Sequence, residues 1–161
     1  MNLSSHLAKH FRDVHFGGNW TAVNLKDTLA DISLEEAGTR VGSLNTILAL
    51  VYHINYYVTA ILKVLNGSPL DASDKYSYDH PGPGNEAEWQ QLLQQYREQA
   101  ENFAAKVEQL PDEMIWANFS DGKYGNYYRN IQGLIEHTHY HLGQISLVKK
   151  MIREQKAASG S

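Results

Sequence analysis

Four long segments of this chain show the periodicity of amphipathic helices. Apolar residues recur every three or four positions from about Ser4 to His15, from Ser33 to about Leu65, from Glu86 to Gln109 and from about Tyr127 to Glu154. That spacing lines one face of an α-helix, and no segment shows the strict alternation that is typical of a half-buried strand. The sequence therefore predicts an all-α fold, an up-down four-helix bundle with two long irregular connections.

Turn-forming residues separate the helical segments. Ser33 and Glu36 have the spacing of a capping box, which is expected to open the second helix. The two long irregular connections are residues 70–85, which contain Pro81-Gly82-Pro83-Gly84, and residues 112–125. With 161 residues the chain fits one domain, expected over residues 1–156, followed by a polar tail at 157–161 that we expect to be frayed.

Charge and composition narrow the choice of partners. The formal net charge of −4 argues against nucleic acid as the main ligand. The first twenty residues lack the apolar core of a signal peptide, so a cytoplasmic location is expected. Ile47–Leu65 is apolar and nearly long enough to span a bilayer, but His53, Asn55 and Lys63 interrupt it, and we interpret it as a buried helix of a protein with no membrane partner. Because the chain has no cysteine, a metal would have to be bound by nitrogen and oxygen atoms.

The last helical segment contains three histidines in Glu136-His137-Thr138-His139-Tyr140-His141. Each residue of an α-helix turns the chain by about 100°, so the apolar stripe of this segment lies within about 60° of Leu134. His141 falls at about −20° and His137 at about −60°, so both point into the bundle, whereas His139 falls at about 140° and is expected to face solvent. Histidines at i and i+4 can direct two nitrogens to one metal ion. The alternative is a pair of ordinary buried histidines; a metal would satisfy both imidazoles at once.

A third ligand is expected from another helix. His53 lies inside the apolar second helix but at the edge of its stripe, so periodicity alone does not select it. His6 and His10 also have i, i+4 spacing, but they lie near the terminus where an exposed surface is expected. His15 and His80 are expected at the surface as well.

Two other metal schemes do not fit the sequence. Glu136 and His139 match the Glu-x-x-His unit of di-iron bundles, but no second copy exists. The His-Glu-x-x-His pattern of zinc proteases is absent too.

The chain resembles the DinB-like metal-binding family, also called the DinB/YfiT superfamily. The similarity rests on the histidine in LVYHINYY, on the Trp-led third helix that ends in Leu-Pro-Asp, and above all on IQGLIEHTHYHLGQI, with its run Glu-His-x-x-x-His-x-Gly-Gln. This resemblance implies a four-helix bundle in which His53, His137 and His141 bind one divalent metal ion, commonly zinc or nickel. It also implies a homodimer and, in characterised members, transferases or isomerases that depend on a small thiol such as bacillithiol or mycothiol.

Three nitrogen ligands leave a divalent ion with an open position, as in catalytic sites. Our leading hypothesis is a metal-dependent transferase that adds a small external thiol to an electrophile, because the chain has no cysteine of its own. The alternatives are a hydrolase that uses metal-bound hydroxide, weakened because Glu136 at about 200° points away from the core, and a non-catalytic metal-binding or dimeric interaction protein. Polar substrate contacts are expected from a set of four residues, Tyr57, Tyr124, Asn126 and Gln144.

Overall fold

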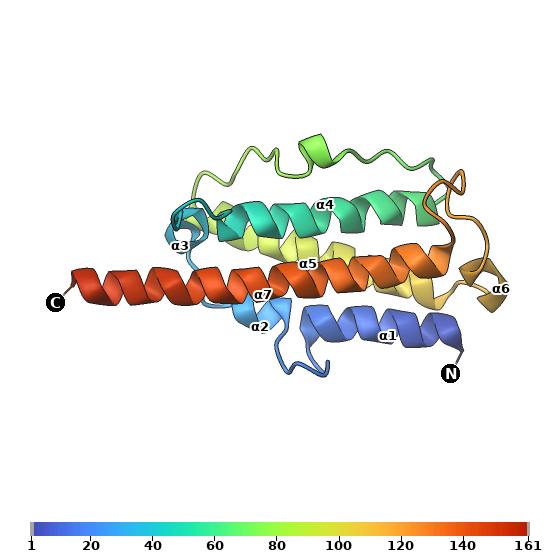
Figure 1. Cartoon of the computed structure of the whole chain (residues 1–161), viewed down its shortest axis with the longest axis horizontal. Helices are drawn as coiled ribbons and strands as arrows, with labels where there is room; N and C mark the ends of the chain where they lie inside the picture. The colour runs from blue at the N-terminus through green and yellow to red at the C-terminus, as the bar shows by residue number, and fades with distance from the viewer. Residues whose placement is uncertain (1, 161) are drawn as a thin grey trace.

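The structure, a computed structural model, describes residues 2–160, and every regular element in that range is a helix (Figure 1). In chain order the elements are α1 (Leu3–Phe16), α2 (Leu25–Leu29), α3 (Leu34–Gly38), α4 (Ile47–Leu65), the 3₁₀ turn η1 (Asp74–Tyr76), α5 (Glu86–Glu108), α6 (Asp112–Ile115) and α7 (Tyr127–Ser159).

The four long helices α1, α5, α4 and α7 form a bundle in which each packs against the next and α7 closes the ring on α1. The predicted four-helix bundle is therefore confirmed. The up-down order is wrong at one step, because Figure 1 shows that α4 and α5, which follow one another in the chain, run the same way. The connection between them passes along the whole length of the bundle before α5 begins. That connection, residues 66–85, is called the α4–α5 connection below.

The second predicted helix is divided in two. Ser33 and Glu36 do form the expected capping box, but the helix they open, α3, ends at Gly38. Gly42 then adopts a positive φ of 54°, which L side chains rarely take, and the helix restarts at Ile47 behind the side-chain cap of Thr46. The periodicity continued across this break because apolar residues on both sides pack into the same core.

Three other bounds differ from the predictions. The short helix α6 lies in the 112–125 connection that was expected to be irregular, and α2 lies in the segment that connects the first two predicted helices. Helix α7 continues to Ser159, so residues 157–159 of the predicted frayed tail are helical, and Ser161 lies outside the described residues. Helices α2 and α6 bury apolar side chains but have only five and four residues, too few to show a helical period. Residues 157–159 are exposed, so no buried apolar face marks that last turn of α7.

Helix α4 occupies the inside of the bundle. Its side chains are buried or half-buried except Lys63, and α3, α5 and α7 all pack against it. By length and composition it could cross a membrane, yet 56% of its apolar window is buried within the bundle, as expected for a core helix. Because one chain already covers this helix, its apolar surface no longer supports a homodimer, which stays a prediction.

Candidate metal centre

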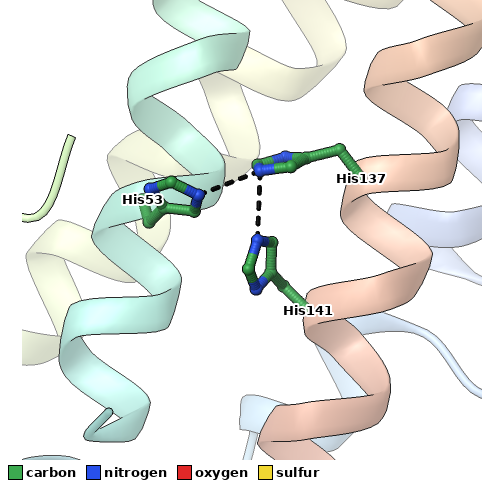
Figure 2. Close-up of side chains that lie close together, drawn as sticks. All are labelled: His53, His137 and His141. Atoms are coloured by element: carbon green, nitrogen blue, oxygen red, sulfur yellow. Dashed lines mark hydrogen bonds between the residues drawn. The ribbon is translucent and has the colours of Figure 1, made fainter. Parts of the chain in front are cut away.

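Three histidines from two helices meet inside the bundle. His53 comes from α4, and His137 and His141 come from α7, and Figure 2 shows their rings pointing toward one another. The His137 Nε2 atom lies 3.0 Å from His53 Nε2 and 3.1 Å from His141 Nε2. One nitrogen from each ring can be chosen so that all three atoms lie within 4.8 Å of one another. The ring nitrogens therefore converge on one point.

The hydrogen bonds of the opposite ring nitrogens fix the tautomers of two histidines. His141 Nδ1 lies 2.7 Å from the Gln144 amide oxygen, which can only accept, so Nδ1 carries the proton. His53 Nδ1 lies 2.9 Å from the Ser77 hydroxyl, and that hydroxyl donates its own proton to the Asp74 carbonyl, 2.8 Å away. His53 Nδ1 is therefore the donor to Ser77. Both rings present an unprotonated Nε2 to the shared point.

This arrangement fits a cation. Two Nε2 lone pairs face His137, and a single N–H on its Nε2 could donate to only one of them. A divalent ion between the three nitrogens would accept all three lone pairs, and the His137 proton would then lie on Nδ1. That Nδ1 is buried with no hydrogen-bond partner within the described residues. The donor set, three imidazoles with no carboxylate or thiolate among them, is one that zinc and nickel accept.

Burial keeps the three imidazoles ready to bind metal. The side chains of His53 and His141 are only 4% and 5% exposed, and His137 is half-buried. Desolvation lowers the pKa of all three histidines, and the neighbouring rings lower the pKa of His137 further, to about 4. Neutral imidazole is the form that ligates a metal, so protons do not compete for these nitrogens at neutral pH.

The α4–α5 connection supplies the outer contacts of His53. Ser77 is fully buried beneath the ring, and Tyr78 stacks on it with 4.0 Å between ring centroids and 7° between the planes. Asp74 accepts a 2.9 Å hydrogen bond from the Tyr57 hydroxyl, which ties the connection to α4. Burial and this carboxylate raise the pKa of Tyr57 to about 12, so its hydroxyl stays protonated. The roles of Ser77 and Asp74 could not be inferred from the sequence, because residues in an irregular segment have no periodicity that indicates their position.

An open cavity of about 570 Å³ lies beside the histidines. Besides the three rings it is lined by hydroxyl, charged, amide and apolar residues, namely Tyr57, Ile61, Asp74, Arg129, Asn130, Gly133, Leu134, Glu136 and Tyr140. The cavity gives a ligand direct access to the point where the nitrogens converge. A metal there would keep an open position, which distinguishes a catalytic from a structural site.

The four expected polar contacts are not equivalent. Tyr57 lines the cavity, and Gln144 orients His141 from behind the ring. The Asn126 side chain is used as the N-cap of α7, where it accepts from the Arg129 amide. Tyr124 is exposed and accepts through its carbonyl from Arg129 and Asn130, and neither Tyr124 nor Asn126 lines the cavity.

The remaining histidines show how well helical spacing predicted which side chains are exposed. His6 and His10 are exposed, as predicted. The solvent-facing prediction for His139 is wrong: the ring is half-buried where α7 packs on α1, 6.0 Å from His10. His15 is buried, 7% exposed, and stacks on Phe11, so its expected surface position is wrong too. A helix packed on two sides has a wider buried face than a single apolar stripe indicates.

Two further sequence expectations change at the edge of the site. His80 is half-buried beside Tyr52, not fully at the surface. Glu136 is exposed as expected, yet its side chain lines the cavity.

Replacing Ser77 by Ala is expected to weaken metal binding about 10- to 100-fold, because His53 loses the partner that fixes its tautomer and ring orientation. A competition titration with a chromophoric chelator measures the change. Ser73→Ala is the matched control, since Ser73 lies in the same connection and is held through its backbone amide by the Tyr56 hydroxyl. Equal affinities for the two variants would show that the Ser77 contact does not orient the ligand.

Comparison with protein-family models finds a match to the model described as the DinB superfamily, over residues 19–145. Neither the curated proteins nor the solved structures contain a match to this chain.

Proposed function

The chain belongs to the DinB superfamily, and on this premise we propose that His53, His137 and His141 bind one divalent metal ion, zinc or nickel, in a metal-dependent thiol transferase. The observation that carries the metal proposal is the convergence of three Nε2 atoms, two of which are held unprotonated by Ser77 and Gln144. Without a cation, an N–H on His137 Nε2 could satisfy only one of these two acceptors, and a buried acceptor without a donor is unfavourable.

The transferase part of the proposal follows from the open side of the cluster. A bound divalent ion lowers the pKa of a thiol that reaches it, which makes the thiol nucleophilic at neutral pH. The chain contains no cysteine, so the thiol must be a separate molecule that enters through the cavity. Asp74 and Glu136 are carboxylates on the cavity wall that can accept the proton released by that thiol.

A hydrolase is the second candidate, and one observation favours it. Hydrolysis at a metal needs a general base near the attacking water. The spacing of α7 predicted that Glu136 points away from the core, yet both Asp74 and Glu136 line the cavity and could act as that base. The third candidate is a protein that binds metal without catalysis.

Protein loaded with one equivalent of Zn²⁺ is expected to accelerate conjugation of 2-mercaptoethanol to 1-chloro-2,4-dinitrobenzene, and removal of the metal with a chelator is expected to abolish the acceleration. Absorbance of the thioether product measures the rate. Hydrolysis of a nitrophenyl ester without thiol conjugation would favour the hydrolase, and metal binding with neither reaction would favour the non-catalytic protein. The homodimer and the cytoplasmic location remain predictions, and sedimentation equilibrium tests the former.

A further inference from the structure

The cavity beside the three histidines also contains a cationic group that the fold does not neutralise. Arg129, in the first turn of α7, lines the cavity and is exposed. No carboxylate lies within 4.0 Å of its guanidinium among residues 2–160, whereas Arg12 and Arg153 each pair with two acidic residues. A guanidinium left unpaired at the edge of a cavity is available to a ligand.

The guanidinium of Arg129 is nevertheless held in place. Its Nη1 donates a 2.9 Å hydrogen bond to the Tyr124 carbonyl. Its stem lies against Gly125, where a Cβ would come within 3.1 Å of the Arg129 Cδ, and the φ of +83° at Gly125 also favours glycine. The other guanidinium N–H groups make no hydrogen bond within the described part of the chain, so a positioned fork of donors remains for a planar anion.

The cavity wall between Arg129 and the histidines includes an open position and apolar side chains. Gly133 lies on it one turn before His137, and a Cβ there would meet no atom within 4 Å. Ile61 from α4 and Leu134 from α7 supply apolar surface to the cavity. The eight residues from Arg129 to His137 rise about 12 Å along the helix, a distance that a ligand of several carbon atoms can bridge because the arginine side chain is long.

We propose that this cavity binds a carboxylate ligand with an apolar body, its anionic end on Arg129 and its reactive end at the three histidines. The proposal deepens the function proposed above and rests on it. A singly charged carboxylate fits better than a phosphate, because Asp74 and Glu136 on the same cavity would repel a second negative charge more strongly. The carboxylate can belong to the thiol or to the electrophile, and the experiment separates these two sources.

The test uses protein loaded with Co²⁺, in which thiol binding produces a sulfur-to-cobalt absorption band. The probes are 6-mercaptohexanoate and the uncharged 6-mercaptohexanol. Wild-type protein is expected to bind the acid about tenfold more tightly than the alcohol, and Arg129→Gln is expected to remove this preference while its affinity for the alcohol is unchanged. Lys123→Gln is the control, because Lys123 is a cation six residues before Arg129, just ahead of α7, and does not line the cavity. Equal binding of acid and alcohol by wild type, or a preference that survives in Arg129→Gln, overturns the proposal.

A second arm identifies which molecule carries the carboxylate. Hexanoate is titrated into the metal-loaded protein, with and without saturating 2-mercaptoethanol, and followed by NMR chemical shifts. Hexanoate that binds beside the small thiol, and does so more weakly in Arg129→Gln, assigns the carboxylate to the electrophile. Hexanoate excluded by the thiol assigns it to the thiol. If neither thiol produces the cobalt band, the thiol function fails, while Arg129-dependent hexanoate binding would still uphold the carboxylate site and its absence would overturn it.

Discussion

His141→Ala is expected to lower the affinity for a divalent ion more than a hundredfold, whereas His139→Ala leaves that affinity unchanged. Both residues lie in α7, two positions apart, but only His141 belongs to the cluster, where its Nε2 lies 3.1 Å from His137 Nε2. Loss of one of three ligands removes a direct bond to the metal, and this costs more than loss of an outer contact, which is worth about 10- to 100-fold. Metal content per chain after gel filtration, and competition with a chelator, measure the effect.

His139→Ala is a demanding control because that side chain is half-buried against α1. Its removal is expected to lower the thermal stability without changing the metal content. The unfolding temperature of each metal-free variant separates loss of fold from loss of ligand. Equal loss of metal from the two variants, at equal stability, would refute the ligand assignment.

The second large effect is a loss of stability in acid caused by His15. The His15 Nδ1 donates a 2.9 Å hydrogen bond to the Phe11 carbonyl, one turn earlier in α1. Burial of the ring lowers the pKa of His15 to about 4. In the unfolded chain the pKa is about 6.5, so between pH 6.5 and pH 4 the unfolded state binds a proton that the folded state does not. The free energy of unfolding therefore falls as the pH drops through this window, by up to about 3 kcal/mol at pH 4. Protonation of His15 does not contribute to the pH dependence at pH 7 and above.

Urea unfolding at a series of pH values, with a chelator present throughout, measures this loss. His15→Asn keeps a donor close to the position of Nδ1 but does not titrate, so its free energy of unfolding should fall less steeply between pH 6.5 and pH 4. His6→Asn replaces an exposed histidine of the same helix and should behave like wild type. A His15→Asn profile parallel to that of wild type would show that His15 takes up its proton in the folded state.

Much of the fold could be predicted because helical periodicity records which faces are buried. The same arithmetic placed His137 and His141 on the inward face of α7, and the structure brings both rings to the cluster. His53 needed the family resemblance, because it lies at the edge of the apolar stripe of α4 and not at its centre. Periodicity measures average burial along one helix and does not encode which two helices face each other.

The parts that could not be predicted depend on irregular backbone or on packing between helices. Ser77, which bonds His53 and donates to the Asp74 carbonyl, lies in a connection whose path has no repeating pattern. His15 and His139 are buried because a second helix packs over them, which the apolar stripe of their own helix does not show. Arg129 became a candidate only once the structure placed it on the same cavity as the histidines, without a carboxylate partner within the described residues.

X-ray absorption spectroscopy of the protein loaded with one equivalent of Zn²⁺ tests the three-histidine centre most directly. We expect three imidazole nitrogens at about 2.0–2.1 Å from the zinc, with a further light ligand that a thiol replaces by sulfur at about 2.3 Å. Two or fewer imidazoles around the zinc, or a spectrum unchanged in His53→Ala, would contradict the assignment.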